Sequence, residues 1–296
     1  MSQAESSSLP SKTTPSVSPL LNLVPSWMLV VIAIISVQIG AAVAKQLFDI
    51  AGPTGVVFLR TLVAGLLFVG LWRPKVRGLG RIAYIYVVLY GINIAFMMLA
   101  FYAAINLIPL GITVAIAFAG PLIVAVIGSH RLSDVLWVVL AGIGILLLSP
   151  FTNEGLDPVG VLLAFLSALT WATFILLSAR ITKVMDGNTA LTFAMIIASL
   201  VSLPIGIIGA VGVLVSPSLI LLSIIVGVLS SAVPFALEFH ALKTMPPRAF
   251  GLLVSLEPVV ATLICFVVLQ EMLALPDIIG IILVTIAATA TARSVK

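Results

Sequence analysis

Apolar runs, each close to twenty residues long, dominate this sequence and restrict what it can fold into. The 296 residues are 62% hydrophobic and only 8% charged, whereas a soluble globular chain carries about 25% charged residues. A helix needs about 20 mostly apolar residues to cross the hydrocarbon core of a bilayer. We therefore predict an all-α polytopic membrane protein with ten transmembrane helices. The spans are expected near 27–44, 54–72, 82–103, 107–128, 133–150, 158–179, 188–213, 218–240, 248–269 and 275–292.

The positions of the charged residues agree with this number of spans. If the N-terminus lies in the cytoplasm, all but two of the fourteen Lys and Arg residues fall in cytoplasmic segments, as the positive-inside rule requires. The exceptions are Lys45, which falls on the outside, and Arg60, which falls within a span. Both termini are therefore expected to be cytoplasmic. Residues 1–26, rich in Ser, Thr and Pro, are expected to form a disordered tail.

Several classes of protein fit the sequence poorly. The single cysteine, Cys265, lies in an apolar run, which gives neither a disulfide framework nor a metal cluster. The sequence has no Gly-rich phosphate loop, no nucleophile elbow and no paired-His metal motif. The two histidines both fall near cytoplasmic helix ends, and no ring of charges indicates a channel filter. We therefore expect no enzyme activity, no cofactor, no metal and no ATP-driven pump. The basic residues lie in short loops, which does not favour nucleic-acid binding.

Two proline-framed stretches repeat at an offset of 137 residues. Ile108–Pro121 (IPLGITVAIAFAGP) and Met245–Pro258 (MPPRAFGLLVSLEP) each contain two prolines twelve residues apart. They form the fourth and ninth spans, which are five apart, so that the two halves of the chain would be inserted with opposite orientation. We therefore expect two inverted five-helix repeats, 27–152 and 153–296. Such a repeat places a substrate site near the bilayer midplane.

The chain resembles the EamA-type transporters of the drug/metabolite transporter superfamily, and most of all the threonine/homoserine exporter group. The resemblance is carried by 108–144, 230–263, FLRTLVAG at 58–65 and ALTWATFILLSAR at 168–180. It implies a central cavity lined by the first, third, fourth, sixth, eighth and ninth helices, and export coupled to the proton gradient. One position departs from the pattern of that group. Ala117 stands where an acid is expected in the fourth helix, which bears on the substrate and not on the fold.

Glu257 is the strongest functional candidate, because a carboxyl group near the middle of a span costs about 2.5–3.5 kcal/mol on insertion scales. Such a group can carry a proton between the two sides, or exchange it for a cationic group of a substrate. Alternatively, a neutral Glu257 fixes helix register through a hydrogen bond, for which Pro258 frees a carbonyl one turn back. Glu238, nearer the cytoplasmic end, is either an interfacial charge or an acid at the cavity mouth.

Other polar and aromatic residues are candidates for the wall of a small cavity. Gln38 has an amide that either binds a substrate carboxylate or joins two helices. Arg60 keeps its charge and is expected to have a structural or pairing role outside the main cavity ring, with contact to the substrate as the alternative. The other candidate lining residues are Asn93, Phe96, Tyr102, Phe118, Trp171 and Ser255, while Pro121, Pro234 and Pro258 are expected to kink helices.

These observations together predict a secondary active exporter of small amino-acid-like metabolites in the bacterial inner membrane. It would exchange substrate for protons by alternating access, as a monomer or a weak homo-oligomer. The alternative is an exporter of other metabolites or amphipathic drugs in the same superfamily, for which Trp171 would matter more than Glu257. The expected partners are a small-molecule substrate, protons and the lipid bilayer, with no nucleic acid.

Overall fold

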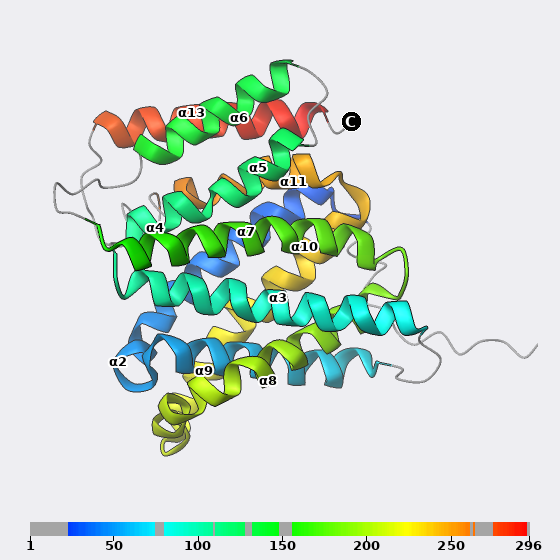
Figure 1. The fold of residues 1–296 in the computed structure, drawn as a ribbon, viewed down its shortest axis with the longest axis vertical. Coiled ribbons are helices and arrows are strands. Elements are labelled where there is room, and N and C mark those ends of the chain that lie inside the picture. Colours follow the sequence, from blue (N-terminus) through cyan, green and yellow to red (C-terminus); the bar gives the residue numbers. More distant parts are fainter. Residues whose placement is uncertain are drawn as a thin grey trace, which may run out of the picture.

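The computed structural model describes residues 23–74, 80–108, 110–127, 132–147, 156–260, 263 and 275–294. Within these ranges the chain forms helices and no strand, and most of the helices run along one common direction (Figure 1). In chain order they are α2 (Ser26–Trp72), α3 (Arg81–Ile105), α4 (Leu110–Ala117), α5 (Ala119–Ile127), α6 (Leu132–Leu147), α7 (Pro158–Ile181), α8 (Gly187–Leu214), α9 (Pro217–Gly227), the π-helical turn η1 (Val228–Ala232), α10 (Val233–Thr244), α11 (Pro247–Val254) and α13 (Leu275–Ser294).

Helix α2 is two helices joined by a sharp bend at Gly52. Gly52 has φ 64° and ψ 169°, a conformation that is essentially restricted to glycine. Pro53 follows directly, and its fixed φ and missing N–H suit the first turn of a new helix. The first two predicted spans, 27–44 and 54–72, are therefore the two arms of α2.

The fourth and ninth spans are both interrupted close to a proline. The fourth span consists of α4 and α5, with a turn at Phe118, three residues before Pro121. In the ninth span α11 ends at Val254, and helix resumes at Glu257, just before Pro258. A proline in a helix removes one backbone hydrogen bond and crowds the carbonyl one turn back. Both proline-framed stretches are therefore discontinuous helices.

The eighth span contains a different irregularity. It runs through α9, η1 and α10, and the N–H of Val233 bonds to the carbonyl of Val228, five residues back. In a regular α-helix this N–H would bond to the carbonyl of Leu229, four residues back. The carbonyl of Leu229 is therefore left without a backbone donor, and the hydroxyl of Ser36 on α2 donates to it at 2.7 Å. The irregular turn thus offers carbonyl groups to α2.

The predicted number and order of helices are confirmed: the described residues contain ten helices when the arms of α2 are counted separately and the interrupted spans are joined. Three contacts join helices at the same position in the two halves: α2 packs against α8, α5 against α11, and α6 against α13, while α3 packs against α7. The pair α6 and α13 lies at one edge of the molecule in Figure 1. The two halves are therefore in extensive contact, while their inverted-repeat relationship stays a prediction.

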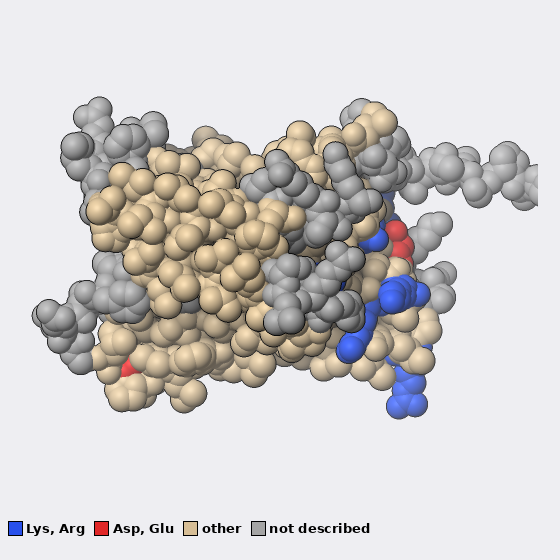
Figure 2. All heavy atoms as spheres, turned by 90° about the horizontal axis from the view of Figure 1, so that it is seen from above, with Lys and Arg blue, Asp and Glu red and all other residues tan. Residues whose placement is uncertain are grey.

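The outer surface of the bundle is apolar. Large side chains such as Ile208 and Leu162 are 82% and 67% exposed, whereas soluble monomers rarely show large contiguous apolar patches. In the described part of the chain, five helices are long and apolar enough to span a membrane. Lys and Arg side chains gather at one end of the molecule in Figure 2. Along the chain, the basic residues next to helix ends include Arg73, Arg81, Arg180, Lys183, Lys243 and Arg248.

Candidate functional site

A cavity of about 300 Å³ lies among the membrane-spanning helices, at the small end of the usual range for small-molecule sites. The first, third, fourth, sixth, eighth and ninth helices all contribute to its wall, as the resemblance implied. The breaks in the fourth and ninth helices lie at the cavity, since Phe118 and Pro258 line it. The polar lining residues are Gln38, Arg60, Tyr102, Ser167, Ser230, Glu238 and Glu257.

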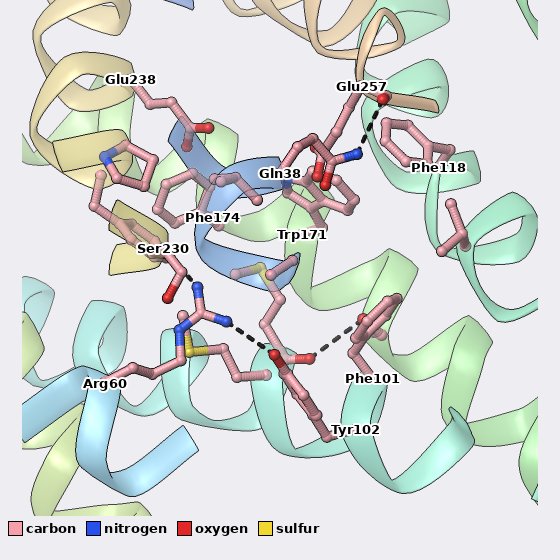
Figure 3. Close-up of a pocket in the computed structure, with 18 of the residues that line it drawn as sticks. Gln38, Arg60, Phe101, Tyr102, Phe118, Trp171, Phe174, Ser230, Glu238 and Glu257 are labelled. Atoms are coloured by element: carbon pink, nitrogen blue, oxygen red, sulfur yellow. Dashed lines mark hydrogen bonds between the residues drawn. The ribbon is translucent and has the colours of Figure 1, made fainter. Parts of the chain in front are cut away.

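Two carboxyl groups, those of Glu238 and Glu257, reach the cavity from the same side (Figure 3). Glu238 is on α10, and Glu257 begins the helical turn that follows the break after α11. The backbone carbonyl of Glu257 accepts a hydrogen bond of 3.2 Å from Nε2 of Gln38. The cavity therefore holds two acids.

Arg60 faces these acids from the opposite side of the cavity (Figure 3). Its Nε donates to Oγ of Ser231 at 2.7 Å, Nη1 donates to the hydroxyl of Tyr102 at 3.1 Å, and Nη2 donates to the carbonyl of Ser230. That carbonyl is available because Pro234, four residues later, has no N–H. The guanidinium group is thus fixed by hydroxyl and carbonyl oxygens of the η1 region and α3.

The position of Arg60 differs from the sequence-based expectation, which placed it outside the main cavity ring. The second arm of α2 packs against α9 and η1, and this contact turns Arg60 towards the cavity. The second helix is therefore part of the wall. The expected pairing exists, but its partners are neutral oxygens of Ser231, Tyr102 and Ser230.

Aromatic rings form much of the remaining wall. Trp171 and Phe118 lie with ring centroids 4.9 Å apart, and both line the cavity. Tyr102 lines it too, where it meets Arg60. These three residues were candidates for the cavity wall on sequence alone, and the structure places them there.

A second set of rings is buried next to the cavity, towards the basic helix ends. Tyr90 stacks on Phe174 with centroids 5.5 Å apart and contacts Phe239 at 6.1 Å. The hydroxyl of Tyr90 bonds to Ser178 Oγ at 2.7 Å, and Ser178 donates to the carbonyl of Phe174 at 2.7 Å. All three rings are at most 2% exposed. Since Phe174 also lines the cavity, this buried cluster adjoins the cavity wall.

Three candidate residues do not line the cavity. Asn93 joins two helices instead, with Nδ2 donating to the carbonyl of Thr170 at 2.9 Å. Phe96 is 50% exposed and lies on the apolar outer surface. Ser255 is buried, and its hydroxyl donates to the carbonyl of Leu252 at 2.6 Å.

The prolines hold positions that fit their predicted structural role. Pro234 and Pro258 line the cavity at irregular helix segments, while Pro121 is buried against α11, where a Cβ added to Gly251 would collide with its carbonyl. Ala117 is fully buried and is not part of the cavity wall. The second acid of this cavity is therefore Glu238 on α10, and not a residue of the fourth helix.

The sequence analysis missed several lining residues. Most of them are apolar side chains in uniformly apolar helices, where no pattern distinguishes the cavity face. Ser230 carried a usable signal, because it lies one helical turn before Pro234 and its carbonyl is therefore released. The missed residues include Met97, Met98, Phe101, Ser230 and Phe235. Among the described residues, no group of three or more His, Cys, Asp or Glu side chains is arranged to hold a metal ion.

Ten apolar helices around a small charged cavity, with discontinuous helices at its wall, define a polytopic membrane transporter. A model of the EamA-like transporter family matches residues 158–293. The threonine/homoserine exporter RhtA of Escherichia coli (strain K12) is 35% identical over 258 residues, which cover 86% of this chain and 87% of the relative. The chain belongs to the EamA-like transporter family, in the drug/metabolite transporter superfamily.

Two further comparisons agree with this membership. Protein PecM of Dickeya dadantii (strain 3937) is 28% identical over 258 residues, 82% of this chain and 84% of the relative. A crystal structure of another protein matches with a TM-score of 0.74 over 92% of this chain and 98% of the other, at 20% identity. At that identity the structural match supports the fold alone.

Proposed function

We propose that this protein exports small amino-acid-like metabolites of the threonine/homoserine type and exchanges them for protons. Its relationship to the RhtA exporters supports a metabolite exporter and a multi-pass protein of the bacterial inner membrane. The observation that carries the finer proposal is the pair of acids in one small cavity, Glu238 and Glu257.

The pair of acids supplies a physical basis for exchange. Two carboxylates close together in a membrane cavity are costly when both are charged, because they repel each other and have lost bulk water. Either a proton or the ammonium group of a substrate relieves this cost. If a proton and the ammonium group of the substrate compete for Glu257 and Glu238, binding of the proton opposes binding of the substrate, and the reverse. Competition of this kind couples the movement of substrate to the opposite movement of protons.

Alternating access would move the two halves, 27–152 and 153–296, around this cavity. The basic end of the bundle fits the cytoplasmic side under the positive-inside rule, which would place both termini in the cytoplasm. With that orientation, the buried rings of Tyr90, Phe174 and Phe239 would lie on the cytoplasmic side of the cavity and oppose loading of substrate from inside.

A second candidate function is export of amphipathic drugs or other metabolites. The paired rings of Trp171 and Phe118 favour it, because aromatic faces bind apolar and cationic molecules well. Both candidates use Glu257 for a cationic group. They differ in whether a small zwitterion or a larger amphipathic cation is the better substrate.

The test uses purified protein in liposomes that contain a pH-sensitive dye. Threonine, homoserine, other amino acids and amphipathic cations are added to wild type, to Glu257→Gln and to the control Asp49→Asn, which changes an exposed acid near the Gly52 bend. We expect threonine or homoserine to drive proton movement in wild type and in the control, but not in Glu257→Gln. Uptake of labelled substrate without proton movement would disprove the coupling. Absence of amino-acid uptake in wild type would disprove the substrate class.

A further inference from the structure

We infer that Arg60 binds the carboxylate of the substrate, so that the cavity selects molecules carrying a carboxylate and an ammonium group together. The inference rests on the proposed amino-acid export and names the group that would recognise its substrates. It assigns Arg60 a role in specificity, in addition to its contacts with the η1 region.

The charge of Arg60 is held in place but not neutralised. A guanidinium group does not lose its proton in a protein, and a charge inside the membrane requires a partner. The hydrogen bonds of Arg60 go to the hydroxyls of Ser231 and Tyr102 and to the carbonyl of Ser230, none of which carries a charge. Among the described residues, no carboxylate forms an ion pair with Arg60 within 4.0 Å. An anion is therefore the missing partner.

The guanidinium group has donors to spare for such an anion. Its three described hydrogen bonds use fewer N–H groups than it has. Its planar fork matches a carboxylate, which it can bind through two parallel hydrogen bonds. Because Arg60 lines the cavity, a bound molecule can reach the N–H groups that remain.

The acceptors that hold Arg60 are part of the helix framework. The carbonyl of Ser230 is released by Pro234, and the neighbouring carbonyl of Leu229 is taken by Ser36. The arginine is consequently positioned before a substrate arrives, and little has to reorganise when a carboxylate binds. A lysine has no planar fork and cannot reproduce the three bonds.

The arrangement of charges specifies the class of substrate. Arg60 lies on one side of the cavity and the carboxyl groups of Glu238 and Glu257 lie on the other (Figure 3). Arg60 is also close enough to act electrostatically on Glu257. A zwitterion can neutralise both sides at once, with its carboxylate towards Arg60 and its ammonium group towards the acids. A simple cation leaves Arg60 without an anion, which disfavours amphipathic amines.

The test compares ligands that differ only in the two charged groups. Proteoliposomes take up labelled threonine in competition with unlabelled threonine, threonine methyl ester, which lacks the carboxylate charge, and 3-hydroxybutyrate, which lacks the ammonium group. In wild type we expect the ester to compete at least about tenfold less well than threonine, because it loses charged hydrogen bonds. In Arg60→Lys and Arg60→Gln we expect threonine to lose most of this advantage over the ester.

Ser231→Ala and Tyr102→Phe serve as milder variants. Each removes one neutral acceptor of Arg60 and keeps the guanidinium group, so that the preference for threonine over the ester should fall about two- to fivefold. These variants keep the inference testable if both Arg60 variants fail to insert into the membrane. An unchanged preference in both milder variants would then overturn it.

The possible failures are distinguishable. If wild type takes up threonine but treats the ester as its equal, Arg60 does not bind the carboxylate, while export of amino acids still stands. The same conclusion follows if the Arg60 variants keep the wild-type preference. If wild type takes up no amino acid, the proposed function fails together with the inference that rests on it.

Discussion

The side-chain amide of Gln38 donates a hydrogen bond of 3.2 Å to the backbone carbonyl of Glu257. This bond joins the first helix of one half to the discontinuous ninth helix of the other half, at the residue that we propose as the site of proton exchange. Gln38 also lines the cavity, so it lies beside both the acid and the space for substrate. Of its two predicted roles, the structure shows the joining of helices.

Replacing Gln38 with alanine should weaken the position of Glu257 without removing its carboxyl group. We expect threonine transport to fall about fivefold, which corresponds to roughly 1 kcal/mol for one lost hydrogen bond, and the number of protons exchanged per substrate to become smaller. The dye-loaded liposomes measure both quantities. Asn93→Ala is the matched control, because it removes a similar bond to the backbone of Thr170 outside the cavity. Equal loss of coupling in both variants would show that Gln38 has no special relation to Glu257.

The two acids should not act independently. We compare the loss of transport, expressed as a free energy, in the double variant Glu238→Gln and Glu257→Gln with the sum of the losses in the two single variants. We expect the loss in the double variant to be smaller than this sum by a coupling energy of about 0.5–3 kcal/mol. The reason is that both carboxyl groups line one small cavity, where two negative charges would repel each other. Threonine transport rates of the four proteins complete this double-mutant cycle. Energies that add to within about 0.5 kcal/mol would contradict a shared site.

Two neighbouring glycines on α6 give a matched test of helix packing. A Cβ on Gly144 would lie 2.6 Å from Cγ2 of Val284 and 2.9 Å from the carbonyl oxygen of Gly280 on α13, whereas one on Gly142 would meet only Cδ1 of Leu122 at 3.7 Å. We expect Gly144→Ala to destabilise the protein by about 1–3 kcal/mol, as overpacking does. Gly142→Ala should be neutral or slightly stabilising. Thermal unfolding in detergent measures both, and equal melting temperatures would contradict close packing of α6 on α13.

The bend in α2 can be tested in the same way. Gly52 has positive φ, and a Cβ added there would meet no atom within 4 Å, so that Gly52→Ala would introduce backbone strain without a steric clash. We expect a loss of about 1–3 kcal/mol in stability. Gly70 also has open space around it but a helical backbone, and Gly70→Ala should therefore stabilise the helix by about 0.5–1 kcal/mol. A Gly52→Ala protein as stable as wild type would show that the bend has another conformation.

The orientation in the membrane has a direct test on α7. In a Cys265→Ser background, Val159→Cys and Lys183→Cys place single thiols near opposite ends of this helix. The positive-inside rule predicts that an impermeant thiol reagent added outside intact cells labels position 159 and not position 183. The reverse labelling pattern would place the basic end of the protein outside the cell, and the protein would then have the opposite orientation in the membrane to the one proposed.

The sequence predicted the spans well and the cavity wall only in part, for a physical reason. Length, hydropathy and loop charges are strong signals in a membrane protein, and they indicated the ten helices, while the prolines marked the fourth and ninth spans. The rotation of each helix is a weak signal, because lipid and protein interior are both apolar. Phe96 therefore looked like a cavity residue and faces outward, while Arg60 looked peripheral and faces inward. Helix contacts decide these rotations.

The rings of Tyr90, Phe174 and Phe239 also have an electrical consequence. A proton crosses a membrane protein along a continuous chain of water or titratable groups. The hydroxyls of Tyr90 and Ser178 end on a backbone carbonyl, that of Phe174, which has no proton to pass on. This chain of hydroxyls therefore gives protons no continuous path through the ring cluster. A carrier that draws on a proton gradient keeps that gradient only if its closed end does not conduct.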